Sequence, residues 1–397
     1  MSIDDLLLER EARHYEYAPD KYICSSCIGD TYMKNWIEEN AQETCECSYC
    51  GKNAKCVSMD SFMDKIMEAV EKRYGQADEV GAGWDSEDKE YTVPVYDKYN
   101  FVWMINDYLQ GSDEVQYELE NLIDDIIWCE RDPYGIPNDK HELYSWHYFS
   151  NVVKSSSRYF FEMAGYDRFN ELLSPMNTLD SIASTVKKLG LIKEMPVGEK
   201  FYRAHSLIKN EKIDYTSERL GAPPSKKAKA NRMSAAGISV FYGTDDIKTA
   251  MKEVLQPNTD SFVIAEFSNS QKIKYLDLTG IKNLTCPSFF DIDKSDIRDK
   301  ISFLYELDKE LVKYIDSNEH IEYVPTQVFA EYFRTFEQID GIKYNSAKGT
   351  SGACVVLFFD NEMFKEKSIN VSEQKIIYNG CKGYKITDIL YKEVPLI

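Results

Sequence analysis

The sequence contains no long apolar run and no excess of positive charge. It lacks any stretch of about 18 consecutive apolar residues, so it predicts no membrane-spanning helix. Lysine and arginine together number 47, against 67 aspartate and glutamate residues, which gives a formal net charge of −20. Binding to nucleic acid is therefore disfavoured, because nonspecific attraction to phosphates requires positive charge.

The composition indicates a folded protein with more than one domain. The chain has 397 residues, of which 13% are aromatic, whereas disordered chains are poor in aromatic residues. This length predicts two or three domains. Residues 1–199 hold 39 acidic and 19 basic residues, and residues 200–397 hold 28 of each. An acidic N-terminal half is thus followed by a neutral C-terminal half.

Cysteine is concentrated near the N-terminus, where six of the ten cysteines lie within the first 56 residues. Two Cys-x-x-Cys pairs, 19 residues apart, predict a zinc site with these ligands: Cys24, Cys27, Cys47 and Cys50. Cys45 or Cys56 could replace one ligand, and a set of free thiols is the alternative. Four thiolates would leave no position for a catalytic water, so the metal would be structural.

The remaining cysteines are scattered, as is usual for reduced thiols in the cytoplasm. The start of the chain, MSIDDLLLEREARHY, is acidic and unlike a signal peptide. Both features predict a cytoplasmic protein.

Apolar residues recur at helical spacing through much of the acidic half. The expected helices cover residues 32–40, 59–74, 99–109, 113–129, 143–164 and 179–189. We therefore divide the chain into a zinc-binding segment (1–58), an all-α domain (59–195) and an α+β domain (196–397).

The α+β domain begins with FYRAH, a short strand that ends near Arg203, and continues with a second strand, Ile238–Tyr242, preceded by Arg232. Gly243 would end that strand, and Thr244 with Asp245 would cap a helix that carries Glu253. Such a strand–turn–helix unit would bring Arg232, Tyr242 and Glu253 to one end of a sheet.

These residue types suit a nucleotide whose N-glycosidic bond is cleaved. The planar fork of an arginine binds a phosphate through two parallel hydrogen bonds. A glutamate can hold ribose hydroxyls and stabilise an oxocarbenium-like centre, and a tyrosine can stack on a ring. The alternative is a surface arginine, a core tyrosine and a solvated glutamate.

Residues 201 to about 360 carry six motifs in one order: FYRAH, NRMS, VFYGT, TAMKEV, PTQ and YNSA. In these motifs the chain resembles the RES domain family. The resemblance implies a fold similar to ADP-ribosyltransferases and a toxin that degrades NAD by hydrolysis or phosphorolysis of the nicotinamide–ribose bond. It implies these site residues: Arg203, Arg232, Tyr242, Glu253 and Ser346. The arginines would hold the phosphates, Tyr242 the nicotinamide end and Glu253 the ribose, and Ser346 would orient the substrate. Asn231 stands where the family often has glycine.

The run from Trp146 to Phe161, with Arg158, resembles the HEPN-like N-terminal domain of some RES proteins. Ribonucleolytic HEPN domains use an arginine and a following histidine with four to six residues between them. None of the five histidines follows an arginine at that distance. We therefore expect a scaffold or regulatory role for this domain, without ribonuclease activity.

The sequence thus predicts an NAD-degrading enzyme, a glycohydrolase or phosphorylase, that acts as a growth-arresting toxin or an antiphage effector. The resemblance implies an antitoxin or regulatory protein as partner, and pairing into homodimers. Two other functions stay open: an ADP-ribosyltransferase that modifies a macromolecule, and a protein that senses a nucleotide without turnover.

Overall fold

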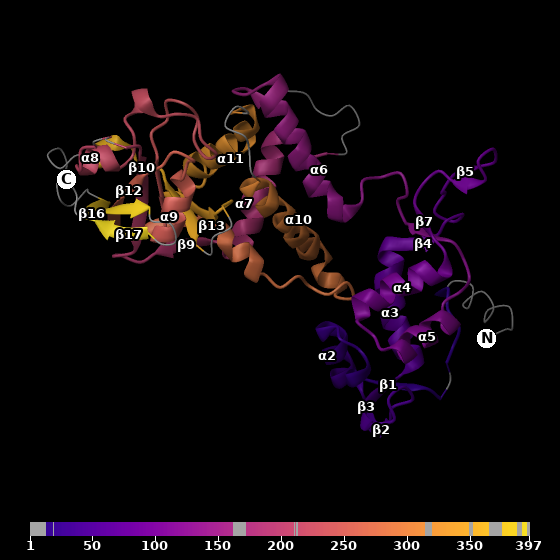
Figure 1. Cartoon of the computed structure of the whole chain (residues 1–397). Helices are drawn as coiled ribbons and strands as arrows, with labels where there is room; N and C mark the ends of the chain where they lie inside the picture. The colour runs from indigo at the N-terminus through magenta and orange to yellow at the C-terminus, as the bar shows by residue number, and fades with distance from the viewer. Residues whose placement is uncertain are drawn as a thin grey trace. The chain divides into compact units, whose positions relative to one another are not determined.

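The computed structural model describes residues 13–18, 20–161, 172–209, 211, 213–313, 320–348, 352–364, 375–386 and 391–394. Contacts divide the chain into two compact units (Figure 1). The N-terminal unit comprises Met1–Lys140 and Thr285–Lys300, and the C-terminal unit comprises His141–Leu284 and Ile301–Ile397. The three-part division expected from the sequence stays a prediction.

The N-terminal unit combines helices with several short strands. Its helices are α2 (Thr31–Asn40), α3 (Met59–Arg73), α4 (Lys98–Leu109) and α5 (Asp113–Leu122). One sheet has the order β1 (Tyr22–Cys24), β3 (Asn53–Ser58), β2 (Glu43–Glu46). A second has the order β4 (Tyr74–Gln76), β8 (Trp128–Glu130), β7 (Val95–Tyr96), and β5 (Trp84–Asp85) pairs with β6 (Glu90–Tyr91). The expected all-α character of residues 59–195 is therefore not confirmed.

Helix α5 ends earlier than expected, at Leu122 instead of residue 129. The Leu122 carbonyl accepts a hydrogen bond from the backbone N–H of Glu16, and the backbone N–H of Asp124 donates to the His14 carbonyl. Because a distant segment bonds these backbone groups, the helix cannot continue through them. The apolar spacing beyond this point belongs to strand β8.

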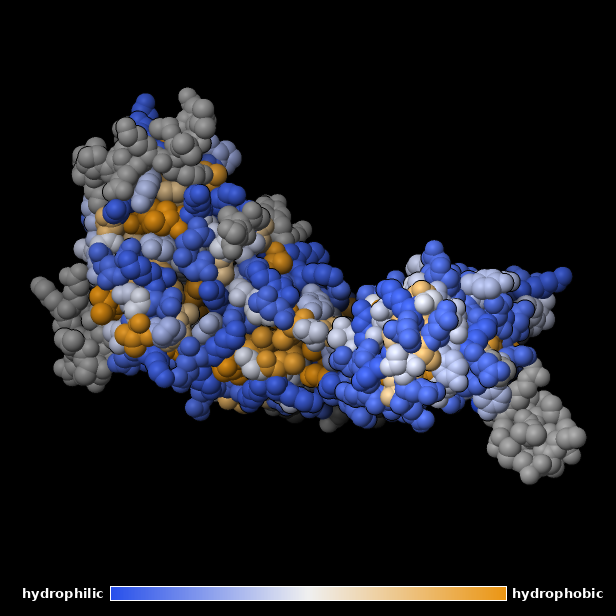
Figure 2. All heavy atoms as spheres, turned by 90° about the horizontal axis from the view of Figure 1, so that it is seen from below, coloured by the Kyte–Doolittle hydropathy of each residue, from blue (hydrophilic) through white to orange (hydrophobic). Residues whose placement is uncertain are grey.

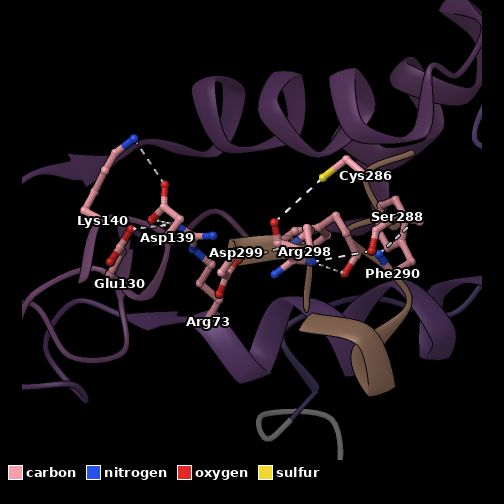
Figure 3. A network of polar contacts seen from close by, with 10 residues as sticks. Arg73, Glu130, Asp139, Lys140, Cys286, Ser288, Phe290, Arg298 and Asp299 are labelled. Carbon is pink, nitrogen blue, oxygen red and sulfur yellow. Dashed lines mark hydrogen bonds and ion pairs between the residues drawn. The ribbon is translucent and has the colours of Figure 1, made fainter. Parts of the chain in front are cut away.

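Residues 285–300, called the 285–300 segment below, complete the core of the N-terminal unit. Phe290 is fully buried among residues from α3 and α4, and the Phe289 ring stacks on Tyr108 with centroids 4.5 Å apart. The Ser288 hydroxyl donates to Asp30 at 3.0 Å. The Arg298 guanidinium donates to the Phe289 carbonyl at 3.0 Å, which closes the segment on itself (Figure 3).

A second part of this polar network surrounds Arg73 at the end of α3. Its guanidinium contacts Asp139 at 2.6 Å and Glu130 at 3.5 Å (Figure 3). The pKa of Asp299 is raised by burial, although the nearby Arg298 and Arg73 oppose that rise. The 285–300 segment therefore joins this unit through apolar, polar and charged groups together.

The C-terminal unit is built on a mixed sheet of nine strands. In order across the sheet they are β17 (Tyr391–Val394), β16 (Ile376–Ile386), β12 (Ser261–Asn269), β10 (Lys200–Leu207), β11 (Phe241–Thr244), β15 (Ala353–Leu357), β14 (Gly341–Asn345), β13 (Ile273–Asp277) and β9 (Ile192–Met195). Neighbouring strands run antiparallel except β13 and β14, which are parallel.

Helices cover the sheet of the C-terminal unit and are spaced along its sequence. They are α6 (Asn138–Asn151), α7 (Pro175–Lys188), α8 (Ser217–Leu220), α9 (Ile247–Val254), α10 (Ser295–Val312) and α11 (Val324–Thr335). The long helix expected over 143–164 is interrupted by a π-helical turn, Val152–Ser156, and residues 162–164 lie outside the described residues. Sheet and helices together form the expected α+β architecture.

Strand β15 contributes to two of the apolar cores of this unit by alternation. Cys354 and Val356 join side chains of α7, α10 and α11 in the helix-side core. Val355 and Leu357 join Phe201 and other residues in the opposite core. All five residues of β15 are buried, as expected for a strand in the middle of a covered sheet.

Hydrophilic residues predominate on the N-terminal unit in the face drawn in Figure 2, whereas apolar residues gather in several places on the C-terminal unit. This contrast agrees with the acidic composition of the N-terminal half. Among the described residues, no helix has the length and apolar character required to cross a membrane.

Candidate active site

The large sheet opens between its neighbouring strands β10 and β11. These strands pair at one position only, Tyr202 opposite Thr244, whereas β10 pairs with β12 at eight positions. The Thr244 hydroxyl contributes a further contact to the Tyr202 carbonyl at 3.3 Å. Away from this point the two strands do not pair.

A cavity of about 230 Å³ lies at this opening. Its walls come from β10, β11, α9, β14 and β15, and the residues are Tyr202, Arg203, Ala204, Asn231, Tyr242, Gly243, Thr244, Ala250, Glu253, Val254, Tyr344 and Cys354. Three residues expected in one pocket therefore meet here: Arg203, Tyr242 and Glu253.

Arg203 is a half-buried cation without an acidic partner among the described residues. Its guanidinium reaches across the opening and donates to the Tyr242 carbonyl at 3.1 Å, and it lies over the Phe241 ring. Burial lowers the pKa of Arg203 to about 10, and the positive charge of Arg219 adds to this effect. An anion bound in the cavity would supply the missing charge partner.

Glu253 is carried by α9, and the start of this helix is tightly fixed. The Asp246 side chain accepts hydrogen bonds from the backbone N–H groups of Lys248 and Thr249 at 2.8 and 3.0 Å, as an N-cap does. Gly352 packs on this cap, since a Cβ there would lie 1.7 Å from an Asp246 carboxylate oxygen. Asp246, and not the expected Thr244 and Asp245, therefore caps the helix.

One carboxylate oxygen of Glu253 is held by Ser346, the residue of the YNSA motif. The Ser346 hydroxyl donates to Glu253 Oε1 at 2.5 Å. The backbone N–H of Lys348 donates to the Ser346 hydroxyl oxygen at 3.1 Å, which leaves the hydroxyl hydrogen for Glu253. The structure thus brings Ser346 to the cavity through its contact with the glutamate.

Tyr242 lines the cavity with its ring, while its hydroxyl is used locally. That hydroxyl accepts a hydrogen bond from the backbone N–H of Met233 at 3.0 Å and lies 3.2 Å from the Ser234 hydroxyl. Burial raises the pKa of Tyr242 to about 12. The phenol therefore stays neutral, and its hydroxyl fixes the loop that carries Arg232.

Arg232 does not line this cavity, although its neighbour Asn231 does. Its guanidinium donates to the Lys313 carbonyl at 2.5 Å and lies over the Tyr323 ring. Its second terminal nitrogen, Nη1, is buried without a partner among the described residues. The role of Arg232 in phosphate binding stays a prediction.

The loop from Ser217 to Arg232 gives the region around the cavity a positive charge. Five of its residues are basic, and Glu218 is its one acidic residue. Its three lysines, Lys226, Lys227 and Lys229, form no ion pair with any described residue. In a chain with a net charge of −20, this local excess would attract an anionic ligand.

Comparisons with known proteins address the two halves of the chain separately. The model of the RES domain matches residues 200–378. Residues 200–378 form a RES domain. The model of HEPN/RES N-terminal domain 1 matches residues 40–167. Both resemblances seen in the sequence are therefore confirmed.

Among solved structures, the M. tuberculosis MbcT–MbcA toxin–antitoxin complex shows 12% identity and a TM-score of 0.28. The match covers 52% of this chain and 93% of the other chain. A search of the curated proteins finds no match.

Tyr344 and Cys354 are among the lining residues that were not predicted from the sequence. Tyr344 lies two residues before Ser346 on β14, and burial raises its pKa well above the ordinary value. The Cys354 thiol lies 3.4 Å from Glu253 Oε1. The sequence indicates a role for Cys354 only through its thiol, which is the one side-chain hydrogen-bond donor in the apolar run ACVVL.

The four predicted zinc ligands gather at one point in the N-terminal unit. The sulfur atoms of Cys24, Cys27, Cys47 and Cys50 lie within 4.8 Å of one another. Neighbouring sulfurs are 3.5 to 3.9 Å apart. Tetrahedral thiolates about 2.3 Å from one zinc ion would lie roughly 3.8 Å apart. The geometry therefore fits the metal.

Backbone groups support the same site. Gly51 adopts a φ of +66°, and its N–H donates to the Cys47 carbonyl at 2.9 Å. Burial would raise the pKa of Cys47, but the backbone N–H groups of Tyr49 and Cys50 outweigh it and lower the pKa to about 7. Cys56 instead points its thiol at the Ala54 carbonyl at 3.3 Å, away from this cluster.

Proposed function

We propose that the RES domain cleaves the bond between nicotinamide and ribose in NAD. The C–N bond would break with its electron pair passing to the ring nitrogen, which neutralises the pyridinium. Water or phosphate would form the new bond to the ribose carbon, with release of a proton when water is the acceptor. Glu253 would stabilise the oxocarbenium-like centre between these two events.

The observation that carries this proposal is the pairing of Arg203 with Glu253 in one cavity. A cation without an acidic partner suits the pyrophosphate of a dinucleotide. A carboxylate with one oxygen held by Ser346 keeps its other oxygen available for the ribose. Tyr242 and Tyr344 supply aromatic surface for the nicotinamide ring.

The size of the cavity suggests which part of the substrate it takes. Sites that enclose a whole drug-sized ligand measure roughly 300 to 1,000 Å³, and this cavity measures about 230 Å³. We infer that it holds the nicotinamide and its ribose. The pyrophosphate would lie between Arg203 and the rim, where the basic residues from Ser217 to Arg232 would also attract it.

The test compares wild-type protein with Glu253→Gln, using the exposed Glu199→Gln as the matched control. Wild type and Glu199→Gln should consume NAD, and Glu253→Gln should lose at least about a hundredfold in kcat, with the melting temperature unchanged. Assays with and without phosphate, read by product mass, identify the acceptor. Equal turnover by Glu253→Gln and wild type would refute the assignment.

The same assay separates the two other functions. Label from NAD that appears on protein or nucleic acid would indicate an ADP-ribosyltransferase. Binding measured by calorimetry without product would indicate a sensor. Cleavage of free NAD is favoured over both because Arg203 and Glu253 line one cavity.

For the N-terminal unit we propose a structural zinc ion and a regulatory role without ribonuclease activity. The acidic surface of this half suits a protein partner better than a nucleic acid. By analogy with its family, the chain would act in the cytoplasm as a growth-arresting toxin or an antiphage effector, restrained by an antitoxin, and would pair into a homodimer.

A further inference from the structure

Cys354 has an unusual position for a buried thiol, because it contacts a carboxylate inside the cavity. Its sulfur lies 3.4 Å from Glu253 Oε1, the oxygen that also accepts the Ser346 hydroxyl. The residue is 6% exposed and lines the cavity. Two donors, one from the residue that follows β14 and one from β15, therefore meet on one oxygen of the glutamate.

No other residue of strand β15 has a side chain that could donate a hydrogen bond to Glu253. The other four residues of β15 are Ala353, Val355, Val356 and Leu357, all of them apolar. Alternation directs Cys354 and Val356 to the helix-side core, where a valine at 354 would pack as well. A thiol at this one position, at the end of the strand next to Glu253, supplies a donor that packing alone does not require.

The thiol keeps its proton at neutral pH. Burial raises its pKa above the ordinary range, and the charge of Glu253 adds to that rise. The protonated thiol donates and cannot act as a nucleophile. Glu253 Oε1 is then occupied by Ser346 and Cys354, which leaves Oε2 for a bound ligand.

We propose that Cys354 is a positioning residue, which together with Ser346 fixes the rotation of the Glu253 carboxylate for the reaction. This inference rests on the proposed function, because it assigns Glu253 to the cleavage of NAD. It separates the two oxygens of the carboxylate: Oε1 is anchored to the protein, and Oε2 is presented to the ribose.

The experiment measures kcat and KM for NAD in the full-length protein for wild type, Cys354→Ala and Cys354→Ser. We expect Cys354→Ala to lower kcat about tenfold, as loss of one hydrogen bond to a charged group does, with KM unchanged. Cys354→Ser restores a donor of similar size and should recover kcat to within about threefold of wild type. Cys381→Ala removes a thiol outside the cavity and should match wild type.

Each result decides the matter. Equal kcat in Cys354→Ala and wild type would overturn the inference, and so would equal losses in Cys354→Ala and Cys354→Ser, because the loss would then follow packing and not the donor. If Cys354→Ala melts below the assay temperature, Cys354→Val takes its place, because it removes the donor and keeps a buried apolar side chain of similar size; kcat equal to wild type in Cys354→Val would overturn the inference. Absence of turnover in wild type would overturn the proposed function and this inference together. Turnover that requires Glu253 but ignores Cys354 would overturn this inference alone.

Discussion

Arg203 shows how a single residue is placed for binding at the expense of stability. In the folded protein the Arg203 guanidinium is half-buried, and it contacts the Tyr242 carbonyl and the Phe241 ring. Because its pKa falls from 12.5 to about 10 on folding, the unfolded chain holds this proton more tightly. A basic group with this sign of shift opposes folding at every pH where it is charged, and stability rises as the pH passes from about 10 upward.

We therefore predict that Arg203→Gln stabilises the protein and abolishes NAD loss. The free energy of unfolding should rise on the order of 1 kcal/mol at pH 7, since removing a charged group from a functional site commonly has this effect. Urea unfolding measures it, with the exposed Arg334→Gln as the control that should show no gain. A drop in stability for Arg203→Gln would show that the guanidinium serves the fold.

The sequence could predict which of the candidate residues lie together, but not all of their side-chain directions. Arg203, Tyr242, Glu253 and Ser346 come together as their motifs imply. The Arg232 side chain does not line the cavity, because its guanidinium donates a hydrogen bond to the Lys313 carbonyl at the end of α10. The two residues are 81 positions apart in the chain. Local spacing carries no information about such a partner.

At the scale of elements, helices were predicted more accurately than strand ends. α3 and α4 agree with their apolar spacing to within one residue. β11 covers Phe241–Thr244 in place of the expected Ile238–Tyr242. The Ser239 hydroxyl donates to the Pro223 carbonyl, which draws the start of the expected strand into a loop. Gly243 lies inside the strand, where a Cβ would meet the Phe241 ring at 2.7 Å.

The turn between β2 and β3 carries Cys47 and Cys50 of the proposed zinc site. We predict one bound zinc per chain in wild type and in Cys45→Ser, and loss of zinc in Cys47→Ser, because Cys47 belongs to the four-sulfur cluster and Cys45 does not. Removal of zinc by a chelator should lower the stability of the N-terminal unit by at least about 3 kcal/mol. Elemental analysis and thermal unfolding measure both. An unchanged melting temperature after complete removal of zinc would exclude a structural ion.

At the scale of the whole molecule, the RES domain sequence is interrupted in space. The match covers residues 200–378, yet the 285–300 segment within it belongs to the N-terminal unit. A fragment that begins at residue 196 would leave Phe289 and Phe290 without the core that buries them. Functional assays therefore require the full-length protein.

We predict that Phe290→Ala destabilises the N-terminal unit by about 3 to 5 kcal/mol, the usual range for a fully buried phenylalanine. Phe336→Ala, at a side chain that is 60% exposed, is the matched control and should change little. Hydrogen exchange followed in α3 and α4 reports on this unit directly. Equal protection of these helices in the two variants would show that the 285–300 segment is dispensable for the core.

The 285–300 segment also determines when, during translation, the N-terminal unit can complete its core. Residues 13–140 leave the ribosome before this segment, and about 145 further residues must be made before Phe290 can enter their core. At roughly 5 to 20 residues per second, the nascent N-terminal unit waits on the order of 10 to 30 seconds in an unfinished state. Translation beyond residue 300 thus completes the N-terminal unit, at a moment when β14, β15 and Ser346 of the catalytic sheet have not yet been made.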